Sequence, residues 1–101
     1  MRMLMIVRLH HETFNEAVKD GSAGPKMNAI LKEVKPDAVY FTEMNGQRTA
    51  VIIVEMERVS MIPSLVEPWF LTFNADVEVH PVMIGQDLEE VGLAELGKKW
   101  G

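Results

Sequence analysis

The chain has 101 residues, no cysteine, a hydrophobic content of 48% and a formal net charge of −5. This length predicts one domain over residues 1–101, because a second would need roughly another 100 residues. The absence of cysteine excludes disulfides, thiolate metal sites and a cysteine nucleophile. The excess of 15 acidic over 10 basic residues argues against binding to the phosphate backbone of nucleic acids.

The sequence carries no recognisable targeting or membrane signal. Residues 1–9 are apolar, but Arg8 interrupts them and no small-residue cleavage site follows, so we expect no signal peptide. No stretch approaches the roughly 18 uncharged apolar residues that a membrane span requires. We therefore expect a cytoplasmic protein that has no membrane partner.

The first third of the chain predicts a strand and then a helical region. Residues 2–9 are apolar and β-favouring, which predicts the first strand. Thr13 and Glu16 have the spacing of a capping box, so we expect a helix to begin there. Glycine interrupts the apolar stripe near residue 21, and the stripe then continues toward Pro36. We interpret this region as one broken helix.

The middle of the chain predicts a hairpin and a second helix. Residues 37–44 and 47–57 are strand-like and flank Asn45-Gly46, which is the strongest short hairpin signal. Ser60 can cap the helix that follows, and its apolar residues keep helical spacing. We expect Pro68 to kink or end this helix, and Asn74 to terminate it or shape its turn.

The last quarter predicts a strand and a C-terminal helix. Residues 76–84 alternate between two faces, as a half-buried fourth strand does. Asp87 and Glu90 make a second capping box, which predicts one helix that ends at the basic pair Lys98-Lys99.

The predicted order is β-α-β-β-α-β followed by a helix, which is the ferredoxin-like pattern of the α+β class. Both crossover helices should cover one face of an antiparallel four-stranded sheet. A two-residue turn at Asn45-Gly46 places Thr42 opposite Thr49 and Tyr40 opposite Val51, which assigns side chains to the two faces. The expected core face comprises Met3, Met5, Val7, Leu9, Val39, Phe41, Ala50, Ile52, Val54, Met56, Val77, Val79 and Met83.

The opposite face of the sheet is mixed in character. It comprises Leu4, Ile6, Arg8, Tyr40, Thr42, Val51, Ile53, Glu55, Glu78, His80, Val82 and Ile84. A monomer would expose several hundred square ångströms of apolar surface there, which marks an interaction site. We therefore expect a homodimer in which the sheet of a two-fold partner covers this face.

A polar cluster is expected on that same face. The first strand should lie between the third and the fourth, which brings Arg8 near Glu55 on one side and near Glu78 or His80 on the other. His10 lies just beyond the end of this strand, and by the alternation of side chains it should point to the same face as Arg8. The cluster would lie in a cavity that the partner covers.

Three segments carry a resemblance to known proteins: Glu67-Pro68-Trp69-Phe70-Leu71-Thr72-Phe73-Asn74-Ala75-Asp76-Val77, Tyr40-Phe41-Thr42-Glu43 and Gly97-Lys98-Lys99-Trp100. They resemble a small uncharacterised bacterial family within the dimeric α/β-barrel superfamily. The resemblance implies two ferredoxin-like protomers that pack sheet to sheet and enclose a pocket in each half. It implies no catalytic residues, and shared fold is a weak guide to chemistry.

These considerations lead to a functional hypothesis with two alternatives. The protein would be a homodimer that binds a small apolar or aromatic molecule in a pocket between sheet and helices. Its chemistry would be cofactor-free, either acid/base chemistry or the oxygenase-type chemistry that the resemblance implies. A non-catalytic module, whose polar cluster only stabilises the dimer, is the first alternative. A metal site of His10, His80 and Glu55 is the second; no spacing motif supports it, and we expect neither metal nor cofactor. The candidate catalytic residues are His80, Glu78 and Glu55, and the candidate substrate-binding residues are Arg8, Tyr40, Thr42 and His10.

Overall fold

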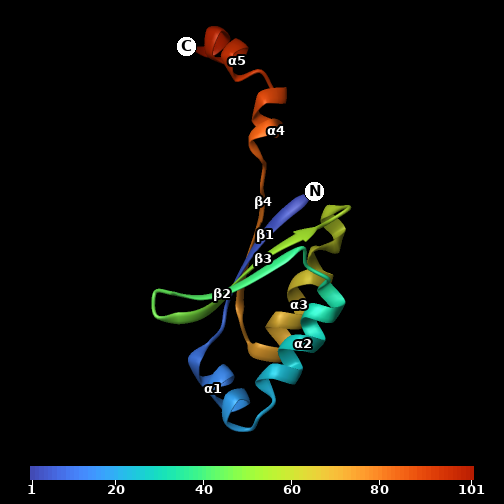
Figure 1. The fold of residues 1–101 in the computed structure, drawn as a ribbon, viewed down its shortest axis with the longest axis vertical. Coiled ribbons are helices and arrows are strands. Elements are labelled where there is room, and N and C mark those ends of the chain that lie inside the picture. Colours follow the sequence, from blue (N-terminus) through green and yellow to red (C-terminus); the bar gives the residue numbers. More distant parts are fainter.

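The computed structural model describes all 101 residues (Figure 1). Its elements are β1 (Arg2–Arg8), α1 (His11–Lys19), α2 (Ala23–Val34), β2 (Ala38–Met44), β3 (Gln47–Glu55), a short 3-10 helix η1 (Val59–Met61), α3 (Ile62–Phe73), β4 (Asp76–Pro81), α4 (Gly85–Glu90) and α5 (Leu93–Trp100). The strands form one antiparallel sheet in the order β2-β3-β1-β4. Helices α2 and α3 lie on one face of this sheet (Figure 1). The predicted ferredoxin-like α+β fold is confirmed.

The β2–β3 hairpin turns as the sequence predicts. Asn45 and Gly46 both have positive φ, at 54° and 79°, as a two-residue type I′ turn requires. The pairing of Thr42 with Thr49 and of Tyr40 with Val51 is also as expected. The Gly46 N–H additionally donates to the Glu43 carboxylate at 2.9 Å, which holds the turn closed.

Gly46→Ala should lower the free energy of unfolding by about 1–2 kcal/mol, because a β-carbon disfavours the left-handed conformation. Gly24→Ala is the matched control, since Gly24 lies in α2 at a negative φ with open space around its α-carbon. The effect of that change should stay within about 0.5 kcal/mol, because the helix-favouring effect of alanine is opposed by the position just before Pro25. Urea denaturation of both variants checks the pair, and equal effects would contradict the turn geometry.

The core lies between the sheet and its helices, where side chains of β1 and β3 pack against α2 and α3. Its largest fully buried side chains include Trp69 and Phe73. Phe14 of α1 packs against Phe73 with ring centroids 5.3 Å apart. The sixteen buried members are Met3, Met5, Val7, Leu9, Ala17, Met27, Ile30, Ala50, Ile52, Val54, Met56, Leu65, Val66, Trp69, Phe73 and Ala75. The predicted core face is therefore largely confirmed.

Two residues expected in the core are exposed instead. Phe41 is 60% exposed because no helix covers the hairpin end of the sheet (Figure 1). Met83 is 67% exposed because β4 ends at Pro81, earlier than expected. The neighbouring strand β1 begins at Arg2, whose carbonyl accepts the last sheet hydrogen bond from the Val82 N–H at 3.0 Å. Beyond that point the chain has no strand to pair with.

The helical region after β1 differs from the expectation of one broken helix. Helix α1 begins at His11 instead of Thr13, and no side chain caps it. A turn over residues 20–22 separates α1 from α2, because Gly21 has φ of 81° and the Asp20 carboxylate accepts the Ser22 N–H at 2.8 Å. The chain therefore forms two distinct helices here.

Of the two expected effects of Pro68, a kink or the end of the helix, the second was wrong, because α3 runs through this proline to Phe73. The lost backbone hydrogen bond is offset because four residues of the helix, Leu65, Val66, Trp69 and Phe73, are buried in the core. Ser60 lies in η1 and does not cap α3. Asn74 does end the helix, in the left-handed conformation with φ of 53°.

Residues 82–101 form a segment that we call the C-terminal arm. Figure 1 shows it extending away from the sheet beyond the end of β4. It contains two short helices, α4 and α5, instead of the single helix expected, because Gly92 between them has φ of 68°. At the start of α4 the Ile84 N–H donates to the Asp87 carboxylate at 2.9 Å, which caps the helix. No helix of the protein combines the length and the apolar character needed to cross a membrane.

Candidate functional site

The face of the sheet opposite the helices, which we call the open face, carries all but one of the candidate side chains. Its central apolar residues, Leu4, Ile6, Val51 and Ile53, are half-buried, and Tyr40 is 65% exposed. Strand register places Arg2, Leu4, Ile6, Arg8, Ala38, Tyr40, Thr42, Thr49, Val51, Ile53, Glu55, Asp76, Glu78 and His80 on this side. The expected division of side chains between the two faces is therefore confirmed within the strands. Val82 and Ile84, which were also expected on this face, lie beyond the end of β4.

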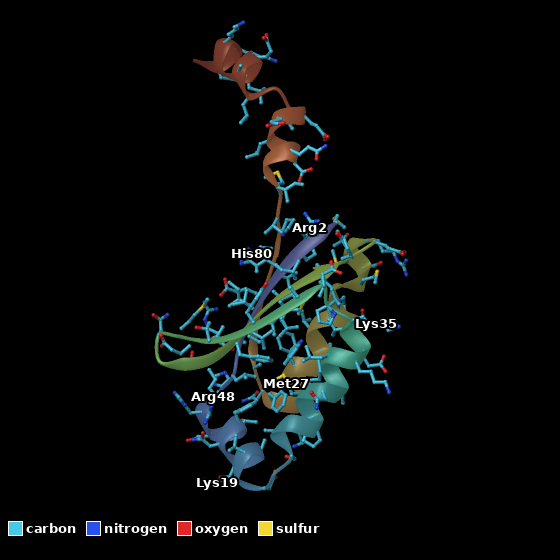
Figure 2. The ribbon with its side chains drawn as sticks, in the orientation of Figure 1. Arg2, Lys19, Met27, Lys35, Arg48 and His80 are labelled. Atoms are coloured by element: carbon cyan, nitrogen blue, oxygen red, sulfur yellow. The ribbon has the colours of Figure 1, made fainter.

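Three charged or titratable side chains meet on the open face, and we call them the Arg8–Glu78–His80 cluster. The Arg8 guanidinium donates to Glu78 Oε2, and His80 Nε2 lies 3.1 Å from Glu78 Oε1. Glu78 and His80 are two residues apart on β4, so they share a face. Glu78 faces Ile6 in register and reaches Arg8 diagonally. Figure 2 shows His80 on the strand from which the arm continues.

Two hydrogen bonds hold the pKa of Glu78 below its ordinary value of 4.5, and the bond from Arg8 contributes more than the bond from His80. The carboxylate is therefore ionised at neutral pH. Consequently Glu78 anchors the two neighbouring side chains, whereas a catalytic acid would need a raised pKa.

Acidification should weaken the interactions of Glu78 with Arg8 and His80. The pKa of Glu78 is lower in the folded state than in the unfolded state, so the cluster stabilises the fold above about pH 4.5. This stabilisation is lost as the pH falls below 4.5 and passes the pKa that Glu78 has in the folded protein. We expect the denaturation midpoint of the wild type to fall more steeply below pH 4.5 than that of Glu78→Gln. Chemical denaturation between pH 3 and pH 7 compares them, and parallel curves would contradict the ion pair.

Glu55 does not join the cluster, contrary to expectation. Antiparallel register pairs it with Arg2, at the opposite end of β1 from Arg8, which faces Thr49. Its carboxylate instead lies 3.4 Å from the amino group of Met1.

His10 also lies apart from the cluster. Its Nε2 is 3.2 Å from the carboxylate of Asp76, a residue that sequence reasoning missed. Asp76 faces Arg8 across the β1–β4 pair, so extending the register of β4 back to its first residue would have identified it. With His10, His80 and Glu55 each paired elsewhere, the suggested metal set does not converge, and no group of three metal-ligating side chains gathers in the chain.

Tyr40 and Thr42 lie on the open face, as expected, but on the far edge strand. Two strand spacings separate β2 from β1 and three separate it from β4. At about 4.8 Å per spacing, β2 lies roughly 10 Å from the strand of Arg8 and roughly 14 Å from the strand of Glu78 and His80. Both side chains are exposed. Within one chain they do not contact the cluster.

The chain has two surface hollows. One of 510 Å³ lies at the root of the arm and is lined by Met1, Arg2, Glu55, Pro81, Val82, Met83, Ile84 and Asp87. The other, of 250 Å³, is lined by His10, His11, Glu12, Thr13, Gln47 and Asn74. Neither lies between the sheet and its helices, where core side chains fill the space. The expected pocket at that place is therefore absent from the single chain, and the candidate side chains point to the other face.

Comparisons with known proteins give little beyond the fold. No family model matches the chain, and no curated protein does. Among solved structures, a protein titled "De novo designed protein Ferredog-Diesel" is similar with a TM-score of 0.48 and 10% sequence identity. The similarity covers 80% of this chain and 85% of that one. The assignment to the ferredoxin-like class of α+β proteins follows from the order and pairing of the strands in this chain.

Proposed function

We propose that the protein is a homodimer whose open faces come together over the Arg8–Glu78–His80 cluster, and that this cluster binds a small apolar or aromatic acid. The observation that carries the proposal is the open face itself, which is apolar at its centre and covered by no part of the chain. Contiguous apolar patches of this kind mark interaction sites on soluble proteins. A two-fold partner covers the same patch on both copies at once.

The chemistry of the cluster suits an anionic ligand. Arg8 uses one guanidinium N–H for Glu78, and its remaining donors can hold a carboxylate in a bidentate pair. The neighbouring Leu4 and Ile6 supply apolar contact for the body of the ligand. Tyr40 of the second copy can approach the cluster from the opposite side, since two-fold symmetry brings both edges of the sheet into the interface.

His80 is the candidate for proton transfer. Glu78 fixes one ring nitrogen of the imidazole and leaves Nδ1 free, an arrangement in which a carboxylate orients a histidine base. Histidine can exchange a proton near neutral pH. A ligand with an acidic C–H or O–H group, held by Arg8, would therefore meet a base whose orientation is set by Glu78.

A non-catalytic assembly module is the second candidate function. One observation favours it: neither surface hollow includes the cluster, whose charges already satisfy one another. In this alternative, the ion pair fixes the register of the interface and meets no ligand.

Thermal-shift measurements with aromatic and aliphatic carboxylic acids separate the two candidates. Under the proposal, a bound acid at 100 times its dissociation constant stabilises the fold by about 2.7 kcal/mol, which raises Tm by roughly 10 °C for a domain of this size. Arg8→Gln and His80→Ala should lose most of that shift and remain dimeric.

Arg58→Gln is the matched control, because Arg58 lies outside the sheet and its side chain bonds only to the Ser60 hydroxyl, at 3.0 Å. It should keep the full shift. If His80→Ala and Arg8→Gln dissociate the dimer and no acid raises Tm in the wild type, the assembly module is the correct reading.

A further inference from the structure

The two helices of the C-terminal arm are not covered by the rest of the chain. No residue of α4 or α5 is buried, and none joins the core. The radius of gyration is 17.1 Å, whereas a compact chain of this length has about 13 Å. Isolated helices shorter than about 12 residues are marginal in water. Two helices of 6 and 8 residues therefore need a packing surface to persist.

The arm has an apolar side suited to such a surface. Leu93, Leu96 and Trp100 recur at three- and four-residue spacing on α5 and are 55%, 43% and 77% exposed. The opposite side of α5 is charged, where Lys98 pairs with Glu95 at 3.4 Å. On α4 the exposed apolar residue is Leu88. An amphipathic helix of this kind buries one side and leaves the other in water.

The β2 edge of the sheet is the corresponding uncovered surface. Tyr40 and Phe41 are 65% and 60% exposed and point to opposite faces of the same strand. The outer backbone groups of β2 have no strand partner. Exposed apolar edge strands promote aggregation unless a helix or loop covers them. A helix lying along this edge would contact both aromatic rings.

The arm does not reach the β2 edge of its own chain. It leaves from β4, which is the other edge of the sheet, and Figure 1 shows it pointing away from the hairpin. Only Met83 and Ile84 lie between the last sheet hydrogen bond, at Val82, and the start of α4. The arm can therefore meet a β2 edge only on another molecule, and a second copy of the chain offers that edge.

The surface area that a stable dimer must bury also favours a second copy as the partner of the arm. Four strands at about 4.8 Å spacing and seven residues at about 3.3 Å rise give the open face a footprint of roughly 440 Å². Specific interfaces bury about 800 Å² on each partner. An arm with roughly 20 Å of helix, about 10 Å wide, covers roughly 200 Å². Donating one arm and receiving another brings each copy close to the required area.

We infer that two copies exchange their C-terminal arms, each arm packing its Leu93–Leu96–Trp100 side along the β2 edge of the other copy, over Tyr40 and Phe41. The inference rests on the proposed homodimer and specifies how it is held together. It also places the arm near the Arg8–Glu78–His80 cluster of its own chain, because in the proposed dimer that cluster is approached by Tyr40 of the second copy, which the arm covers.

The chain has no cysteine, so paired cysteine variants test the exchange directly. One preparation carries Leu96→Cys and the other Phe41→Cys, both at exposed positions, and the mixture is treated with a short bis-maleimide. We expect a covalent product of two chains in the mixture. Leu71→Cys, at an 82% exposed position on α3, replaces Phe41→Cys in the control and should give none.

A variant with both cysteines in one chain tests whether the arm instead folds back on its own sheet. If Leu96→Cys and Phe41→Cys cross-link within a single chain and the mixture gives no two-chain product, the arm folds back on its own sheet and the exchange is overturned. Leu96→Glu should weaken dimerisation at least 10-fold and leave the fold intact, whereas Leu71→Glu should not.

Hydrogen exchange on the wild type distinguishes failure of the exchange from failure of the dimer. Protected amides in residues 85–100 are expected. A dimer with a protected open face and an unprotected arm would overturn the exchange and leave the proposed function standing. A monomer at micromolar concentration would overturn both.

Discussion

Trp69→Ala should lower the free energy of unfolding by about 3–5 kcal/mol. The Trp69 side chain is fully buried in the core, with its ring centroid 6.3 Å from that of Phe73. Removing the indole leaves a cavity beneath the sheet that neighbouring side chains cannot fill. Small domains have only about 5–15 kcal/mol of stability, so this variant should approach or cross the unfolding threshold at 37 °C. Urea denaturation followed by circular dichroism measures the change.

Two further changes on α3 test the reason for that loss. Leu71→Ala removes an apolar side chain that is 82% exposed, so its effect should stay within about 0.5 kcal/mol. Trp69→Phe should cost less than Trp69→Ala, because the phenyl ring fills much of the space and because the buried indole Nε1 has no hydrogen-bond partner to lose. A loss below about 1 kcal/mol in Trp69→Ala would contradict the packing of this core.

Ile6→Lys should convert the dimer to a monomer. Ile6 lies at the centre of the open face, between Val51 of β3 and Glu78 of β4. In a two-fold interface every substitution appears twice, so the change places two like charges in an apolar contact. We expect the dimer dissociation constant to rise at least 100-fold, since two ammonium groups would lose their hydration in the interface and the neighbouring Glu78 is already bonded to Arg8 and His80. Sedimentation velocity over a range of concentrations gives the constant.

The matched control for this second change is Leu71→Lys, which adds the same charge on the opposite side of the molecule. It should leave the dimer unchanged. The Ile6→Lys monomer should remain folded, because Ile6 is only half-buried within its own chain. A dimer of undiminished affinity in Ile6→Lys would show that the open face is not the interface.

The parts of the fold that depend on local patterns could be predicted from the sequence. Alternation of side chains assigned the two faces of the sheet, and Asn45-Gly46 set the pairing of β2 with β3. Arg8 and Glu78 were therefore expected together, and they form an ion pair. These predictions succeeded because a period of two and a two-residue turn leave little choice of register.

The pairing of distant segments was harder to predict. No turn connects β1 to β3, so nothing local indicated that Glu55 would face Arg2 and lie far from Arg8. For the same reason the partner of His10, the carboxylate of Asp76, was missed. The spacing of Thr13 and Glu16 suggested a helix start, but α1 begins earlier, at His11. Capping signals compete with the path that tertiary packing imposes on the chain.

The apolar spacing of the C-terminal residues indicated a helix, but could not show that it would leave the body. The periodicity of apolar residues predicts which side of a helix is apolar, but it does not predict what that side packs against. Pro68 illustrates a related limit, since the cost of a proline inside α3 is outweighed by burial that only the folded structure reveals.

The central position of β1 has a consequence for how the protein is made. Residues 2–8 leave the ribosome well before their partners in the sheet, which are residues 49–55 and 76–81. The sheet cannot close until most of the chain has been synthesised, and contacts between such distant segments slow folding. The strongly apolar strand β1 therefore has no partner during much of translation, and exposed apolar strands of this kind are prone to aggregate before folding is complete.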